Sequence, residues 1–304
     1  MADWTGESFV ATSTVKINTN FATQHFEFYN VYQQAVSEMT AVLNAVQSTG
    51  QIPEEPLYHT IFPAVEFLSD YPAVYTLLSQ LETKEDYITK HSIAVGILSK
   101  QIGKALKYPE QTLTLLMRAG TLHDVGKMAV PLSILNKPGK LTTDEFEEVK
   151  QHTIYGYEMI LRTSTFSEAE ALIALNHHER VNGEGYPHRK KAMEFNELAK
   201  IVSVADVFHA MNATKSYHHP LPFYEVLVEM SDGVFGQFDP VISMTFIRHM
   251  MEQLIGEKVV LSDGRIGVIR MIPVASPTKP FIEVSSTIID LNNTPELNIL
   301  RLIP

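Results

Sequence analysis

The segment Gln111–Lys127, QTLTLLMRAGTLHDVGK, places a histidine–aspartate pair at the end of a predicted helix. Apolar residues at helical spacing predict that the helix extends to His123, before a turn-rich stretch. A second helix is expected from Asp144 to about Leu161, because threonines and acidic residues at its start provide capping groups. Helical patterns continue through most of residues 52–256, where strand patterns are nearly absent. This part is therefore predicted to be an all-α bundle.

A short lead-in precedes the bundle, at residues 1–51. The β-branched stretch Phe9–Asn18 predicts a strand, and apolar residues at helical spacing from Tyr32 predict a helix that ends at Gly50. No residue here suggests chemistry, so we interpret the segment as a candidate regulatory element.

The tail, residues 257–304, has a different pattern. Two β-rich runs flank Asp263-Gly264, a pair that favours a hairpin turn, and further strands are expected at Phe281–Val284 and Thr287–Leu291. The predicted fold is thus mainly α, a helical bundle with a small lead-in segment and a small β-rich C-terminal appendage.

Composition narrows the class of function. The 304 residues carry a net charge of −11 at pH 7 and no cysteine. The negative charge argues against binding to polymeric nucleic acid or membrane surfaces, although a locally positive pocket could accept a small anion. Without cysteine, disulfides and thiolate metal ligands are excluded. No run approaches the roughly 18 apolar residues of a membrane helix, and a signal peptide is not apparent. A cytoplasmic protein is expected, and the sequence specifies no oligomeric state.

Histidines and aspartates form a candidate metal site. A lone histidine on a helix is more often packed or exposed than a ligand, but here several occur in one ordered series within predicted helices. Bundle helices can project such side chains into one interior point. Mixed imidazole and carboxylate donors suit iron or manganese, and zinc is less favoured without thiolates. The candidates are His91, His123, Asp124, His152, His177, His178 and Asp206.

The sequence around these residues resembles the HD-GYP family. His123–Lys127 (HDVGK) resembles the signature HDxGK, and His177–Pro187 (HHERVNGEGYP) is similar to HHExxxGxGYP. Val204–Phe208 (VADVF) and Gln237–Pro240 (QFDP) resemble the segments VADxF and FDP that follow in the family. The resemblance extends over about residues 52–255 and implies an HD-type helical bundle.

The resemblance implies hydrolysis of cyclic di-GMP, or a related cyclic dinucleotide, to linear pGpG and onward to GMP. It also implies two divalent metal ions, iron first and manganese as the alternative. The first would be held by His91, His123, Asp124 and Asp206. The second would be held by His152, His177 and His178, with Asp124 bridging both. Asp124 and Lys127 would act in catalysis, and Lys127 would direct its charge at the substrate phosphate; otherwise it is an ordinary surface lysine.

The segment Gly183–Pro187 must be a loop, because it combines two glycines with a proline. A rigid turn is its simplest role. In the family this loop lies beside the site and has been linked to docking of diguanylate cyclase domains. Tyr186 is therefore a candidate contact for a substrate base or a partner, while Gly183, Gly185 and Pro187 shape the turn.

Several positions depart from the family pattern, among them His188–Lys191, which follows the loop. Tyr87 stands where some members have a glutamate that holds a third metal, so two metals are expected. Lys215 and His218 occupy a segment where the family has an arginine-containing run that grips phosphates. His209 stands where an acidic residue is common. We expect an intact metal site with altered substrate-binding residues, Lys215 and His218 among them.

Two other functions remain open. One is a phosphohydrolase of the wider HD superfamily acting on nucleotide monoesters; the glycine–tyrosine–proline loop and the second pair of histidines argue against it. The other is an inactive module that senses the dinucleotide or docks to partners. A missing metal ligand would favour that module, and none of the seven candidates is missing.

Overall fold

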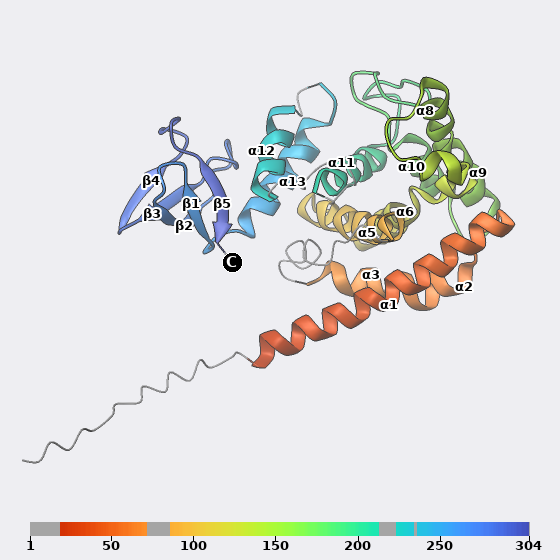
Figure 1. Cartoon of the computed structure of the whole chain (residues 1–304), viewed down its shortest axis with the longest axis horizontal. Helices are drawn as coiled ribbons and strands as arrows, with labels where there is room; N and C mark the ends of the chain where they lie inside the picture. The colour runs from red at the N-terminus through yellow and green to blue at the C-terminus, as the bar shows by residue number, and fades with distance from the viewer. Residues whose placement is uncertain (1–18, 72–85, 213–222, 234–235, 304) are drawn as a thin grey trace, which may run out of the picture.

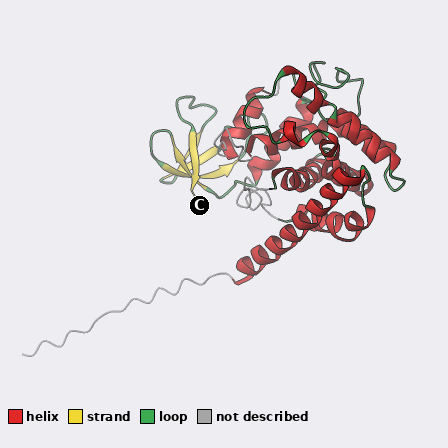
Figure 2. Cartoon of the chain, turned by 45° about the vertical axis from the view of Figure 1, so that its right-hand side comes forward, coloured by secondary structure: helices red, strands yellow, loops and turns green. Residues whose placement is uncertain are grey.

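The computed structural model describes residues 19–71, 86–212, 223–233 and 236–303. In these ranges a helical body is followed by a small sheet near the C-terminus (Figures 1 and 2). A mainly α fold with a β-rich tail is therefore confirmed. The expected strand at Phe9–Asn18 lies outside the described residues. No helix within the described ranges is long and apolar enough to cross a membrane.

The helical body is built from one long helix, several medium helices and short turns of π- and 3₁₀-helix, η1 and η2. In chain order these are α1 (Thr19–Thr49), α2 (Glu54–Pro56), η1 (Leu57–Ile61), α3 (Phe62–Ser69), α5 (Tyr87–Ala105), α6 (Glu110–Leu122), η2 (Val125–Ala129), α7 (Leu132–Leu135), α8 (Thr143–Lys150), α9 (His152–Arg162), α10 (Glu168–Asn176), α11 (Glu197–Asn212), α12 (Phe223–Gly233) and α13 (Pro240–Glu252).

Helix α5 is the centre of this body. Every residue from Thr89 to Gly103 is buried, which is typical of a helix covered on all sides. It packs against α6 along its length and also contacts α1, α3, α11 and α13. Two core clusters meet at α5, because Val95 and Leu98 belong to one and Ile93 and Ile97 to the other. An interior site that includes a side chain of α5 is therefore also lined by residues of several other helices.

Helix α1 packs against α3, η1 and α5. Its side chains Tyr32 and Met39 are fully buried and join the same cluster as residues of α5, α6 and α10. The helix predicted from Tyr32 thus begins earlier, at Thr19. The division of the chain at residue 51 stays a prediction, and across it the lead-in and the bundle share one core.

The predicted helix Asp144–Leu161 is two helices, α8 and α9, separated at Gln151. At the junction the ring Nδ1 of His152 lies 2.6 Å from the carbonyl oxygen of Val149, and the hydroxyl of Thr153 donates to the carbonyl of Lys150 at 3.0 Å. These carbonyls would accept backbone N–H groups in a continuous helix. The N–H of Ile154 instead donates to Gln151 at 2.9 Å. The side chains of the second helix therefore cap the first.

The C-terminal sheet has the strands β1 (Lys258–Leu261), β2 (Ile266–Met271), β3 (Phe281–Val284), β4 (Thr287–Asp290) and β5 (Ile299–Ile303), in the order β4-β3-β2-β1-β5, all antiparallel. The hairpin turning on Asp263-Gly264 is confirmed. Strand β5 was not expected from the sequence; it pairs with β1, Val259 opposite Leu302. The buried face of the sheet joins the core of α12 and α13, where Tyr224 donates to the carbonyl of Thr278 at 2.7 Å.

Candidate metal centre

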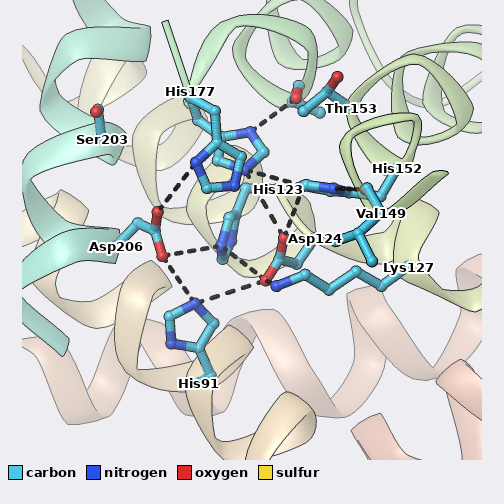
Figure 3. Close-up of polar contacts among 12 residues, drawn as sticks. His91, His123, Asp124, Lys127, Val149, His152, Thr153, His177, Ser203 and Asp206 are labelled. Carbon is cyan, nitrogen blue, oxygen red and sulfur yellow. Dashed lines mark hydrogen bonds and ion pairs between the residues drawn. The ribbon is translucent and has the colours of Figure 1, made fainter. Parts of the chain in front are cut away.

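All seven candidate ligands converge on one interior point, and Figure 3 labels six of them, all but His178. His91 comes from α5, His123 and Asp124 from the α6–η2 junction, and His152 from the first residue of α9. His177 and His178 follow the end of α10, and Asp206 lies in α11. Six of the seven are buried, with exposed fractions of 6 % or less, and His178 is partly buried. Sequence segments up to 115 residues apart, from His91 to Asp206, thus meet at a single site.

Asp124 lies between two sets of imidazoles. Its Oδ2 is 3.6 Å from Nε2 of His91 and 3.4 Å from Nε2 of His123. Its Oδ1 is 3.2 Å from Nε2 of His152 and 3.7 Å from Nε2 of His177. Each carboxylate oxygen therefore faces a different pair of histidines.

Asp206 spans the same two sides. Its Oδ1 lies 3.0 Å from Nε2 of His91 and 3.9 Å from Nε2 of His123. Its Oδ2 lies 3.8 Å from Nδ1 of His178. The first contacts agree with the expected grouping of Asp206 with His91 and His123. The last contact was not expected, and it brings a second carboxylate to the side of His178.

Three of the histidines are oriented by backbone carbonyls. The Nδ1 atoms of His123, His152 and His177 lie 2.7, 2.6 and 2.7 Å from the carbonyl oxygens of Gly120, Val149 and Ala174, each three residues earlier. A carbonyl can only accept, so each Nδ1 must carry the proton. In the neutral ring each Nε2 then keeps its lone pair, and it points into the site. This tautomer is the one that a metal requires from an Nε2 ligand.

His91 is oriented differently. Its Nδ1 lies 2.9 Å from Nδ1 of His209, a buried residue one turn beyond Asp206 on α11. If His91 presents Nε2 to a metal, its Nδ1 donates and Nδ1 of His209 accepts. The sequence marked His209 as a departure but did not place it in the site. Its spacing of three residues from Asp206 puts both on one face of α11, and that is the feature from which the contact could have been inferred.

Burial keeps most of these imidazoles neutral. Burial lowers the pKa of His91 and of His177 to about 4, although their carboxylate neighbours oppose the shift. Burial and the neighbouring His177 lower the pKa of His178 well below its usual value. For Asp124, burial alone would raise the pKa, but Lys127 and His123 lower it well below the usual range. Burial alone would lower the pKa of His123, but Asp124 raises it above the usual value. His91, His177 and His178 thus hold the protonation states of metal ligands, neutral rings beside an ionised carboxylate.

The donor set fits divalent metal ions. Asp124, His152, His177 and His178 offer ligand atoms within 4.8 Å of one another, and so do His91, His123 and Asp124. Nε2 of His123 and Oδ1 of Asp124 are buried without a hydrogen-bond partner among the described residues. Buried polar atoms rarely stay unpaired, and both of these face the centre of the cluster. Metal binding at the centre of the cluster would satisfy them.

Gly126 allows the two halves of the site to meet. A Cβ on this residue would lie 2.0 Å from the carbonyl oxygen of His152 and 2.3 Å from the amide nitrogen of Gly156. No side chain could fit there, so η2 packs backbone against backbone on α9. This close approach brings His123 and Asp124 to His152, and it accounts for the glycine in the HDVGK stretch.

Lys127 extends from η2 back to Asp124, with its ammonium in an ion pair with Oδ2 of that residue. The lysine is part-buried rather than a free surface residue, with 21 % of its side chain exposed. The structure thus places a cation at the edge of the metal cluster. A role in contacting the phosphate of a substrate stays a prediction.

The loop Gly183–Pro187 folds back over the site. Gly185 is required by space, because a Cβ there would lie 2.4 Å from both the carbonyl oxygen of His178 and the amide nitrogen of Arg180. The buried carboxylate of Glu179, which the sequence analysis did not single out, accepts backbone N–H groups of His188 and Lys190 at 2.8 and 2.9 Å. The loop is thereby tied to the residue that follows the two histidines.

Tyr186 lies at the cluster. Its ring stacks on that of His178, with centroids 4.5 Å apart, and its amide donates to the carbonyl of His178 at 3.1 Å. Tyr87, one turn before His91, stacks on that histidine with centroids 5.4 Å apart, in place of a carboxylate. Lys215 and His218, the other two candidate substrate contacts, lie outside the described residues.

Comparison with known protein families identifies an HD domain. The HD domain profile matches residues 75–242, more than half of the chain. A solved structure described as an HDGYP protein from Bdellovibrio bacteriovorus shares the fold, with a TM-score of 0.60 at 19 % identity, over 78 % of this chain and 73 % of that one. The expected HD-type helical fold is thereby confirmed.

Several relatives align with more than half of this chain. A cyclic di-GMP phosphodiesterase of Pseudomonas aeruginosa is 35 % identical over 66 % of this chain and 48 % of its own length, and one of Thermotoga maritima is 36 % identical over 60 % and 50 %. A 3'3'-cGAMP-specific phosphodiesterase of Vibrio cholerae is 31 % identical over 59 % and 34 %. The alignments with the first two relatives thus span about half the length of those proteins.

Proposed function

The chain belongs to the HD domain family, in its HD-GYP branch, and from this membership we propose that it is a metal-dependent phosphodiesterase that hydrolyses cyclic di-GMP or a related cyclic dinucleotide. Linear pGpG is the expected first product, and GMP the second. Relatives named for cyclic di-GMP and for 3'3'-cGAMP support this class of substrate. The observation that carries the proposal is the position of Asp124, with one carboxylate oxygen toward each pair of histidines.

The side chains would divide the work of holding two ions. His91, His123 and Asp206 would hold one and His152, His177 and His178 the other, with Asp124 between them. Asp206 has a further oxygen on the side of His178 and supports the second position as well. We expect iron in the site, with manganese as the alternative, because imidazole and carboxylate suit both. Two bound metals supply a hydroxide at neutral pH and neutralise charge on the phosphate.

The remaining residues would prepare the substrate. Lys127 would leave part of its charge available to a phosphate oxygen next to Asp124, where a cation stabilises the charge that develops during displacement. Tyr186 would cover His178 and restrict access of bulk water from the loop side. Glu184 of the same loop and Asn182, just before it, are exposed and would be open to a diguanylate cyclase domain, the partner that the family resemblance implies.

Product analysis tests the proposal. The protein, loaded with manganese or anaerobically with iron(II), is incubated with cyclic di-GMP, 3'3'-cGAMP, a simple phosphodiester and a nucleotide monoester, and the products are separated by chromatography. We expect linear dinucleotide from one or both cyclic substrates and little from the monoester.

The variant Asp124→Asn serves as the control and is expected to be inactive, because its amide keeps the shape of the carboxylate and lacks the charge. Turnover of the monoester alone would indicate a phosphohydrolase of the wider family instead. Binding of a cyclic dinucleotide without turnover under either metal would indicate a sensor.

A further inference from the structure

A pocket of about 620 Å³ opens beside the metal centre. Its lining includes His178 and Tyr186, and also Phe146 and Lys150 of α8. Its volume lies in the range of small-molecule sites. Because His178 belongs both to the pocket and to the metal cluster, a ligand whose phosphate lies at the cluster would extend the rest of its structure into this space.

Two aromatic rings border the pocket. Tyr186 has one face on His178. Phe146 is 46 % exposed, and the ammonium of Lys150 lies 4.7 Å from its ring centroid and 5.7 Å from that of Tyr186. Phe146 and Lys150 are four residues apart on one helix, and such a pair alone would be ordinary surface packing. The reach of Lys150 to a ring on the distant loop makes the three a defined group at the pocket.

A hydrogen-bonding pair stands next to these rings. Lys150 donates to Oε1 of Glu147 at 2.6 Å, so an ammonium donor and a carboxylate acceptor lie side by side at the rim. Glu147 also lines the pocket and has 58 % of its side chain exposed, which leaves its second oxygen accessible to a ligand. The pocket thus combines stacking surfaces, a donor and an acceptor.

We propose that Phe146, Tyr186, Lys150 and Glu147 form a subsite for one nucleobase of the cyclic dinucleotide and that this subsite prefers guanine to adenine. This inference rests on the proposed function. Any nucleobase can stack on an exposed aromatic ring. Preference comes from the base edge: guanine offers O6 as an acceptor to the ammonium and N1–H and N2–H₂ as donors to the carboxylate. Adenine has an amino donor at position 6 and a bare acceptor at N1.

The geometry gives each residue a separate effect. Phe146 stacks on the base and does not contact its hydrogen-bonding edge, so its loss weakens the binding of all cyclic dinucleotides alike. Lys150 and Glu147 read the edge, so their loss lowers the preference for guanine. Neither Phe146 nor Lys150 contacts the seven clustered ligands through a hydrogen bond or ion pair among those described, so metal content should be unaffected.

The experiment compares Phe146→Ala, Lys150→Met and Glu147→Gln with the unchanged protein at full metal loading. For each we measure KM and kcat with cyclic di-GMP, 3'3'-cGAMP and cyclic di-AMP, and equilibrium binding of the same ligands by calorimetry. Phe146→Ala should raise KM about tenfold for all three and leave kcat nearly unchanged. Lys150→Met should lower the ratio of kcat/KM for cyclic di-GMP over cyclic di-AMP by about tenfold. Glu147→Gln should lower it by a smaller factor.

Matched controls lie outside the pocket. Phe67→Ala on α3 removes another partly exposed phenylalanine, and Lys140→Met removes an exposed lysine before α8. Neither should alter KM or the preference. Phe146→Tyr should keep the stacking and return KM to the value of the unchanged protein. If the role of Phe146 were merely structural, Phe146→Tyr would behave like any other bulky replacement. Metal content and thermal melting are recorded for every variant.

The outcomes separate the two proposals. Hydrolysis by the unchanged protein, with KM and preference unaltered in all pocket variants, would overturn the subsite and leave the proposed function standing. The unchanged protein could instead bind cyclic dinucleotides without hydrolysing them, with weaker binding in Phe146→Ala and less selective binding in Lys150→Met. That result would support the subsite and overturn the proposed enzymatic function. Absence of both binding and hydrolysis in the unchanged protein would overturn both.

Discussion

His91 and the trio His123, His152 and His177 present the same atom to the same site, yet the chain orients them in two ways. Each member of the trio lies at or just after a helix end and bonds to a carbonyl three residues earlier. His91 lies in the interior of α5 and bonds to His209, 118 residues away in the sequence. The comparison separates ligands that are oriented locally from one that depends on tertiary packing.

The physical reason lies in the carbonyls. The last carbonyls of a helix have no intrahelical partner, so an imidazole at the helix end can occupy one. In the interior of α5 the carbonyls are bonded within the helix, and His91 must find an acceptor on another element. A helix end therefore fixes both the place and the tautomer of a ligand, whereas a helix interior fixes only the place.

The largest effect is expected where the two arrangements share a residue. Asp124→Asn removes the charge that faces both sets of histidines, so metal content should fall at both positions and activity by about a thousandfold or more. Elemental analysis of purified protein and the dinucleotide assay measure this. Full metal content with full activity would show that Asp124 does not bridge.

A smaller effect should follow when only the tertiary contact is broken. His209→Ala removes the acceptor for Nδ1 of His91, and loss of such a partner typically costs 10- to 100-fold in metal affinity. In a calorimetric or chelator titration the affinity for one of the two metals should fall, while the affinity for the other is unchanged.

His209→Asn is the matched control for this variant. Its side-chain oxygen lies where Nδ1 of the histidine stands and can accept the same hydrogen bond, so affinity should recover. Equal weakening of both metals in His209→Ala, or no recovery in His209→Asn, would contradict the assignment of His209 to His91 alone.

Lys127 tests whether a cation beside Asp124 serves metal binding or catalysis. Lys127→Ala should keep both metals and lose about a hundredfold in rate, the typical effect of removing one charge-stabilising donor. Lys127→Arg keeps the charge and should recover part of the rate. Metal loss in the alanine variant would instead make Lys127 a support for Asp124, and the catalytic role would be wrong.

The smallest effect concerns a helix that supplies one of the local carbonyls. Thr142 caps α8, which ends next to His152, by accepting the N–H of Glu145 at 3.3 Å while Glu145 accepts the N–H of Thr142 at 2.7 Å. Thr142→Ala should lower the free energy of unfolding by about 1 kcal/mol. Denaturant titration checks this, with Thr142→Ser as the control. Metal affinity should change little; a large loss would mean that His152 is oriented less locally than its bond to Val149 indicates.

Much of the fold followed from periodicity, and the exceptions are instructive. The predicted helix Asp144–Leu161 is interrupted, because His152 and Thr153 bond to carbonyls that the helix needs. Periodicity records which side of a helix is apolar, and it contains no information on such side-chain competition. Strand β5 was missed because its pairing partner, β1, lies about forty residues earlier in the sequence.

The sequence by itself determined the residue types of the site and their positions in the helices. The histidines, both aspartates and the glycines at positions 126 and 185 are explicable from motif and spacing, and the structure brings all seven candidate ligands together. These properties are local, since a helix end or a tight turn depends on neighbouring residues.

Only the tertiary structure decided which atom faces which. The two oxygens of Asp124 face different histidines, Asp206 has an oxygen on each side, and His209 supports His91, because α5, α9, α10 and α11 pack at particular angles around one point. The same packing brings Phe146 and Lys150 of α8 to the pocket that Tyr186 also lines. Such contacts depend on the distance between segments remote in sequence, and no local pattern contains that distance.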